Sequence, residues 1–250
     1  MTQAPLTMIP GPRGALACRM SPGTGPSVVW LCGFGSDMSG TKATALEARA
    51  QARGQPFLRF DYSGCGLSEG AFTDGTISAW LEDALCVLDA FDLKDCVLVG
   101  SSMGGWLSLL VARARPQRVR ALLLIAAAPD FTQRLMEPEL PPEALKALAE
   151  TGRWDRPSAY GPPQPITRAL IEDGRAHHVL TGPIPFAGPV RLLHGQADPD
   201  VPWELSLEIA ERLQSPDVEL TFVKSGEHRL STPENIALLE RTLAALLALL

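Results

Sequence analysis

The chain has 250 residues, of which 46% are hydrophobic and 20% are charged, and its formal net charge at pH 7 is −6. This composition is typical of a globular protein with one large domain, and it excludes a disordered or collagen-like chain. The mild negative charge excludes bulk attraction to nucleic acid or to an anionic membrane, and no apolar stretch reaches the roughly 18 residues of a transmembrane helix.

Short apolar runs alternate with helical patterns over the first half of the chain. In chain order we predict strand 27–32, helix 41–53, strand 56–61, helix 76–91, strand 96–100, helix 103–114 and strand 119–126. Near the C-terminus we predict strand 190–194, helix 203–213, strand 219–223 and helix 233–250. Strands that alternate with helices pair in parallel, so the fold class is α/β, with a mostly parallel central sheet and helices on both faces.

Prolines interrupt this alternation between residues 129 and 189, where two helical segments stand out, 142–150 and 166–174. We interpret residues 130–188 as a small helical cap. The cap is inserted into a single core domain formed by residues 1–129 and 189–250. A disordered linker is the alternative interpretation, and the Leu, Ile and Trp content of the segment argues against it.

The five cysteines are scattered and form no CxxC pair. An odd number of scattered cysteines does not fit a disulfide framework and favours a reducing compartment. The N-terminal residues lack the basic segment and apolar run of a signal peptide and the Arg-rich helix of a transit peptide. We therefore expect a cytoplasmic protein.

The strongest chemical signal is the motif Gly100-Ser101-Ser102-Met103-Gly104. It follows a predicted strand and opens a predicted helix, which is the context of a nucleophile elbow. Glycines at both ends of the motif leave room at a tight, strained turn. The register of the motif makes Ser102 the candidate nucleophile, with Ser101 as the rival. In the alternative interpretation, the serine only caps the helix and has no catalytic role.

A serine hydroxyl needs a positioned base that takes its proton. His228 follows the last predicted strand, at the sheet edge where sites form in open α/β folds, and imidazole suits proton exchange near neutral pH. His194 stands at the end of a strand, and we expect it to be packed and hydrogen-bonded. Asp198 is the first carboxylate beyond that strand and is the expected orienting acid, with Asp200 as the alternative.

Two backbone amides complete the expected site as an oxyanion hole. They belong to Met103, which follows the nucleophile, and to Phe34, in the loop after the first predicted strand. That loop is not a GxGxxG loop, because Met38 stands at the third glycine, and no Walker motif is present, so we expect no cofactor. We also expect no metal, because the adjacent His177 and His178 point apart and lack further ligands at metal spacing.

Residues 61–68 (DYSGCGLS) form a second glycine-containing stretch after a predicted strand. Gly64 and Gly66 predict a tight turn that shapes the loop near the elbow. A thiol nucleophile at Cys65 is disfavoured, because no base is placed by the sequence to serve it.

Taken together, these motifs resemble the α/β-hydrolase superfamily over nearly the whole chain, and the order Ser102, Asp198, His228 is that of the superfamily. Finer stretches are similar to the abhydrolase-domain-ten group of mitochondrial protein depalmitoylases and acyl-glucuronide esterases, with bacterial relatives. These stretches are GFGSDMSGTKA (33–43), LRFDYSGCGLSEGAF (58–72), DGTISAW (74–80), GSSMGGW (100–106), ITRALIEDGR (166–175), VPW (201–203) and GEHRLS (226–231). Two cysteines depart from the superfamily pattern: histidine is usual at the position of Cys65, and many members have histidine at the position of Cys32. Neither change removes a catalytic group.

The resemblance implies a serine hydrolase that cleaves esters or thioesters through an acyl-serine intermediate, without a cofactor. It implies a small-molecule or acyl-protein substrate, such as an S-palmitoylated protein or an acyl glucuronide. A peptidase or a C–C hydrolase would use the same three groups, and a non-catalytic ligand-binding member of the fold is a further alternative.

Large apolar residues of the cap either line an acyl groove or cover the edge of the sheet. They are Leu135, Met136, Leu148, Trp154 and Tyr160. Trp106 and Trp203 are expected to pack in the core, with a place in the wall of the pocket as the alternative.

Overall fold

The computed structural model describes residues 3–157 and 163–250. Eight strands form one sheet in the order β1-β2-β4-β3-β5-β6-β9-β10. They are β1 (Leu6–Gly11), β2 (Gly14–Ser21), β3 (Ser27–Leu31), β4 (Phe57–Phe60), β5 (Cys96–Ser101), β6 (Val119–Ile125), β9 (Val190–Gly195) and β10 (Val218–Val223). Every neighbouring pair from β4 to β10 is parallel. The prediction of a mostly parallel sheet is therefore confirmed.

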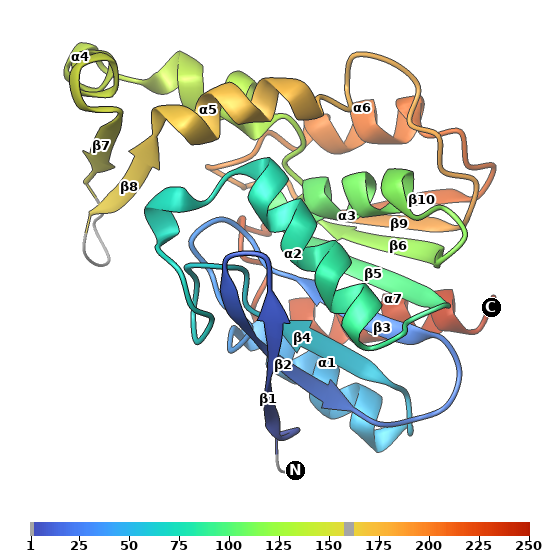
Figure 1. The fold of residues 1–250 in the computed structure, drawn as a ribbon. Coiled ribbons are helices and arrows are strands. Elements are labelled where there is room, and N and C mark those ends of the chain that lie inside the picture. Colours follow the sequence, from blue (N-terminus) through green and yellow to red (C-terminus); the bar gives the residue numbers. More distant parts are fainter. Residues whose placement is uncertain (1–2, 158–162) are drawn as a thin grey trace.

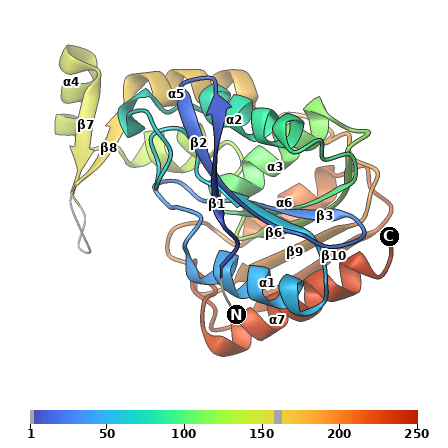
Figure 2. The same ribbon diagram turned by 60° about the horizontal axis from the view of Figure 1, so that its bottom comes forward.

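Helices cover both faces of this sheet, with α1 and α7 on one face and α2, α3 and α6 on the other (Figures 1 and 2). Their bounds are α1 (Thr41–Ala52), α2 (Ile77–Ala90), α3 (Met103–Ala114), α6 (Glu204–Arg212) and α7 (Pro233–Leu247). All five were predicted, and α3 has the predicted bounds. No helix within residues 3–157 and 163–250 is both long enough and apolar enough to cross a membrane.

The centre of the sheet is the core of the molecule. Every residue of β5 is buried, because helices cover this strand on both sides and its side chains have no solvent-facing surface. Helix α3 is buried from Met103 to Ala112. The rigid junction between β5 and α3 therefore holds the GxSxG motif in place.

The N-terminal hairpin was not predicted from the sequence. Strands β1 and β2 pair antiparallel, and β2 adds antiparallel to β4 at the edge of the sheet. In β1 only Ile9 is buried, so the apolar alternation that marks a half-buried strand is missing. Pro10 is tolerated in β1 because an edge strand does not need every N–H for pairing.

Between β6 and β9 the chain leaves the sheet and forms α4 (Pro142–Thr151), the hairpin of β7 (Arg153–Arg156) and β8 (Gln164–Thr167), and α5 (Arg168–Gly174). Helix α4 and the hairpin stand together at one end of the molecule (Figure 1). We call residues 130–188 the cap segment; its separation from a core domain stays a prediction.

The predicted helix 142–150 is confirmed, but the predicted helix 166–174 is wrong at its first two residues. Ile166 and Thr167 belong to strand β8. The Thr167 hydroxyl accepts a hydrogen bond from the backbone N–H of Leu170 at 3.1 Å. This is the bond of an N-cap residue, so the helix begins only at Arg168.

Candidate active site

Ser102 stands on a strained turn between β5 and α3. Its backbone has φ 56° and ψ −120°, a region that residues other than glycine rarely adopt. Its N–H donates to the carbonyl of Ile125 in the neighbouring strand at 2.9 Å. A Cβ atom at Gly100 would lie 2.2 Å from the carbonyl oxygen of Gly104, and one at Gly104 would lie 2.0 Å from that of Leu31. Both glycines are therefore required by the turn, as the motif predicts.

The loops after β9 and β10 bring Asp198 and His228 together. His228 Nδ1 lies 2.8 Å from Asp198 Oδ2. An ionised carboxylate can only accept a hydrogen bond, so Nδ1 carries the proton and donates it to this bond. In the neutral ring Nε2 is then unprotonated, which is the form that can take a proton from a hydroxyl group.

A second histidine, which the sequence predicted to be packed, also holds this carboxylate. His194 is fully buried, with Nε2 3.1 Å from Asp198 Oδ2 and Nδ1 2.7 Å from the hydroxyl of Ser206. Burial raises the pKa of Asp198, but hydrogen bonds from His194, His228 and the backbone N–H of Val201 outweigh it and hold the pKa well below the usual range. The carboxylate is thus both ionised and fixed. The contact between His194 and Asp198 was not predicted.

The alternative acid, Asp200, is exposed, and its backbone N–H donates to Asp198 Oδ1 at 2.8 Å. In the part of the chain that the structure describes, the Asp200 carboxylate makes no hydrogen bond with His228. Side-chain atoms of Asp198, Asp200 and His228 lie within 4.8 Å of one another, the spacing of a metal site. Both oxygens of Asp198 already accept hydrogen bonds, so the arrangement fits proton transfer better than cation binding.

A cavity of about 760 Å³ opens at this edge of the sheet. Ser102, Met103, His228 and Phe34 all line it, so the structure brings these four predicted site residues to one space, with Asp198 behind His228. Among the described residues Ser102 Oγ makes no hydrogen bond with His228. Such bonds often tighten only when substrate is bound. The cavity also has charged lining residues, namely Asp37, Lys42, Glu139, Arg156, Asp200 and Arg229.

The loop after β3 lies directly against Ser102. A Cβ at Gly33 would lie 3.3 Å from Ser102 Cβ. The Ser36 N–H donates to the Gly33 carbonyl at 3.1 Å, which closes a four-residue turn. Gly35, the third residue of this turn, has φ +65°, a conformation that favours glycine. The turn therefore presents Phe34 beside Ser102, where the predicted oxyanion donor belongs.

The side chain of Phe34 anchors that loop in an aromatic cluster. Its ring centroid lies 5.2 Å from Phe72, 5.9 Å from Trp80 and 5.7 Å from Phe131. Met103, the other predicted donor, is the first residue of α3. The first N–H groups of a helix have no partner within the helix and favour negative charge. Both predicted amides are thus held by rigid parts of the fold.

Asp61 ties the turn of residues 61–68 to the loop after β3. Its carboxylate accepts from the backbone N–H of Met38 at 2.6 Å and of Leu67 at 2.8 Å. Gly64 and Gly66 have φ +75° and +51°, so the predicted tight turn is confirmed. Burial raises the pKa of the neighbouring Cys65 thiol to about 12. That thiol stays protonated near neutral pH, which argues against a thiol nucleophile.

Lys42 is a residue of this cavity that the sequence did not single out. It lies in the first turn of α1, and its ammonium group donates to the carbonyl of Arg229, next to His228. Burial, and then the positive charge of Arg229, lower the pKa of Lys42 to about 8. No local sequence pattern indicates the contact between Lys42 and Arg229, because the two residues lie far apart in the chain.

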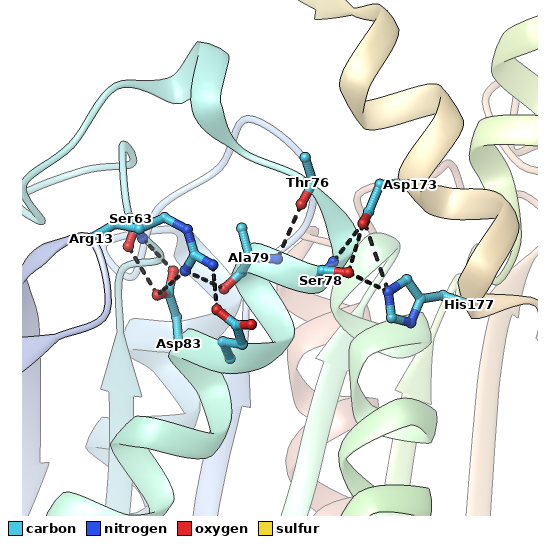
Figure 3. A network of polar contacts seen from close by, with 9 residues as sticks. Arg13, Ser63, Thr76, Ser78, Ala79, Asp83, Asp173 and His177 are labelled. Atoms are coloured by element: carbon cyan, nitrogen blue, oxygen red, sulfur yellow. Dashed lines mark hydrogen bonds and ion pairs between the residues drawn. The ribbon is translucent and has the colours of Figure 1, made fainter.

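The cap segment is anchored to the core by a second cluster of serine, aspartate and histidine (Figure 3). The Asp173 carboxylate accepts from the backbone N–H of Ser78 at 2.8 Å and from its hydroxyl at 2.6 Å. His177 Nε2 lies 2.6 Å from the same hydroxyl. Because the hydroxyl proton goes to the carboxylate, Nε2 must donate to Ser78, and this serine is not activated. The Trp106 indole N–H also donates to the His177 carbonyl, at 3.1 Å.

Replacing Asp173 by alanine is expected to destabilise the protein by about 1–3 kcal/mol, because the first turn of α2 and the Ser78 hydroxyl lose their acceptor. This corresponds to a fall in Tm of roughly 2–4 °C per kcal/mol in a chain of this size. Thermal unfolding followed by circular dichroism measures it. Glu172→Ala, which removes only an exposed pair with Arg168, is the control and should cost less than about 0.5 kcal/mol. Equal Tm values for the two variants would contradict the inference that Asp173 anchors the cap segment to α2.

Only some of the predicted cap residues reach the cavity. Leu135 and Met136 line it, whereas Leu148 and Trp154 are not among its lining residues. Tyr160 lies outside the described residues. Trp106 is fully buried, as expected. The expectation is wrong for Trp203, which is only partly buried and lies outside the core cluster, where it packs on the Phe222 ring with a centroid distance of 5.0 Å.

Comparison with known proteins gives the same fold and family. The model of the alpha/beta hydrolase family matches residues 28–237. The mouse mitochondrial palmitoyl-protein thioesterase ABHD10 is 41% identical over 226 residues, which cover 90% of this chain and 76% of the mouse protein. The predicted resemblance to this group is therefore confirmed.

Two solved structures extend the likeness to the whole fold. A protein from Agrobacterium vitis S4 superposes with a TM-score of 0.91 at 43% identity, over 97% of this chain and 99% of that one. Mouse alpha/beta hydrolase domain-containing protein 10 superposes with a TM-score of 0.88 at 38% identity, over 98% and 99% of the two chains. The chain is therefore a hydrolase and belongs to the α/β hydrolase family.

Proposed function

We propose that this chain is a serine hydrolase that cleaves carboxylic esters or thioesters through an acyl-serine intermediate. The observation that carries the proposal is the 2.8 Å hydrogen bond between His228 Nδ1 and Asp198 Oδ2 behind a cavity that Ser102 also lines. A base in the right tautomer and a nucleophile on a strained elbow thus share one space, and acyl transfer needs both groups.

In the proposed first half-reaction, His228 Nε2 takes the proton of the Ser102 hydroxyl while Oγ attacks the substrate carbonyl. The carbonyl oxygen becomes an oxyanion, which the backbone N–H groups of Phe34 and Met103 stabilise. The His228 imidazolium then gives its proton to the leaving alcohol or thiol, and the C–O or C–S bond breaks. Asp198 stays ionised and stabilises the imidazolium.

In the second half-reaction water replaces the leaving group. His228 takes a proton from the water, whose oxygen attacks the acyl carbon, and the same amides hold the second oxyanion. Collapse of this intermediate returns the proton to Ser102 Oγ and releases the carboxylic acid. No cofactor is needed for these steps.

The name of the mouse relative supports an S-acyl substrate. That protein is a palmitoyl-protein thioesterase at 41% identity, so thioesters of acylated proteins are the first substrates to test, with acyl glucuronides and simple esters beside them. Leu135 and Met136 of the cap segment offer apolar lining for an acyl chain. The cytoplasmic location stays a prediction.

Labelling with a fluorophosphonate tests the proposal. One adduct is expected on the folded protein, because only an assembled serine, base and oxyanion hole react with this probe at a useful rate. Trypsin releases residues 95–113 as one peptide that holds both Ser101 and Ser102, and fragmentation of that peptide assigns the adduct.

Heat-denatured protein is the control and should take no label. The absence of an adduct on folded protein, or an adduct on Ser101, would contradict the proposal.

A further inference from the structure

We propose that Gln164, in the β7–β8 hairpin of the cap segment, is a specificity-determining residue that donates a hydrogen bond to the substrate. Its partner would be an acceptor oxygen within a few bonds of the scissile carbonyl. The inference rests on the proposed hydrolase function and deepens it, because it selects ester and thioester substrates with such an oxygen over purely hydrocarbon ones.

The register of the hairpin turns Gln164 toward the core. Trp154 pairs with Ile166, and Arg156 pairs with Gln164. Directly opposed residues share a face, and so do residues two apart on one strand, so these four side chains lie on the same face. On this face Ile166 is 1% exposed and Gln164 is partly buried, whereas Arg156 at its outer end is exposed. Arg156 and Gln164 both line the cavity that holds Ser102.

Arg156 fixes which end of the Gln164 amide points toward the site. The guanidinium Nη2 of Arg156 donates to Gln164 Oε1 at 2.6 Å. The oxygen of the amide is therefore engaged, and the amide nitrogen, with its two N–H groups, is the end that faces Gly35. A Cβ built at Gly35 would lie only 2.1 Å from Gln164 Nε2.

This contact places a donor of the cap segment one residue away from a proposed oxyanion donor. Gly35 follows Phe34 in the turn that lies against Ser102, and the missing side chain at Gly35 makes the room that Gln164 occupies. A substrate carbonyl held by the Phe34 amide therefore has its flanking atoms within the neighbourhood of Gln164 Nε2. A donor in a cavity wall gains from an acceptor on the ligand and is left unpaired by a methylene group.

The test uses two pairs of esters that differ by one oxygen in place of a methylene group. The first pair is p-nitrophenyl methoxyacetate and p-nitrophenyl butyrate, which differ on the acyl side. The second is 2-methoxyethyl and butyl acetate, which differ on the leaving-group side. For each pair the ratio of kcat/KM values is compared between wild type and variants, so that the intrinsic reactivity of each ester cancels.

Gln164→Glu is the informative variant. It keeps an oxygen for Arg156 and the shape of the side chain, but it replaces the donor with a second acceptor. The preference for the oxygen-containing ester is expected to fall about 3- to 10-fold in at least one pair, the size of one hydrogen bond. A general effect of the new charge on the oxyanion changes both members of a pair alike. Gln164→Ala, which is neutral, should lower the same ratio, and the exposed Gln117→Ala should leave it unchanged.

Ratios that stay within twofold of wild type in both Gln164 variants would overturn the inference. Fluorophosphonate labelling of each variant separates the two ways of failing. Labelled, active variants with unchanged ratios overturn the role of Gln164 alone. A wild type that takes no label and cleaves none of the four esters overturns the hydrolase proposal and this inference with it.

Discussion

Replacing Ser102 by alanine is expected to lower kcat for ester hydrolysis by about 10⁶-fold, the loss seen when the nucleophile of a serine triad is removed. The alanine methyl group cannot form an acyl intermediate, and no other described side chain stands on the elbow between β5 and α3. The residual rate should be that of water attacking a carbonyl that the oxyanion hole still polarises. Initial rates with p-nitrophenyl butyrate measure the loss.

Ser101→Ala is the matched comparison, because Ser101 is the neighbouring serine and the rival nucleophile. Ser101 is the last residue of β5 and is buried, so its replacement should cost far less activity than that of Ser102. Tm values close to wild type for both variants would show that loss of activity is not loss of folding. Equal rates for Ser102→Ala and wild type would refute the mechanism.

Asp198→Asn is expected to lower kcat by about 10⁴-fold, the cost of holding the base in the wrong tautomer. The asparagine oxygen can still accept the backbone N–H groups of Asp200 and Val201, which bind Oδ1 of the carboxylate. Its NH₂ group then faces His228 Nδ1 as a donor. To accept this hydrogen bond, Nδ1 of the His228 ring must be unprotonated. The proton of the neutral ring then lies on Nε2, which can no longer act as the base.

Asp200→Asn separates the two candidate acids. Its side chain is exposed, and the contribution of Asp200 to the site is a backbone N–H that the substitution keeps. We expect a change of less than about threefold in kcat/KM, since exposed charges interact weakly. A large loss of kcat/KM in Asp200→Asn, with little loss in Asp198→Asn, would identify Asp200 instead of Asp198 as the acid that orients His228.

The candidate site could be predicted because parallel strands gather their carboxyl ends at one edge of the sheet. Ser102, Asp198 and His228 each follow a strand that its apolar run made recognisable. The sequence alone was therefore enough to rank Asp198, the first carboxylate after β9, above Asp200 as the candidate acid. The hydrogen bond between Asp198 and His228 agrees with that ranking.

Other features depend on contacts between distant segments, which no local pattern encodes. Gln164 of the cap segment contacts Gly35 in the loop after β3, and Asp173 of the cap segment accepts hydrogen bonds from Ser78 at the start of α2. Gln164 stands outside every motif that the sequence offers, and the stretch 166–175, which contains Asp173, resembles the family without indicating this contact. The start of α5 could not be placed either, because apolar spacing cannot distinguish the end of a strand from the first turn of a helix when Thr167 serves as the cap.

The buried His194 has a consequence for mutational tolerance. Hydrogen bonds lead from the Ser206 hydroxyl through His194 to Asp198 and on to His228, and Ser206 lies on α6 with 1% of its surface exposed. In a library of random variants selected for activity, position 206 should therefore tolerate as few substitutions as positions 198 and 228, although Ser206 does not contact the substrate. In such a survey Ser206 would be the intolerant polar site of α6, beside the buried apolar Leu205 and Ile209, while the exposed positions of the helix accept many residues.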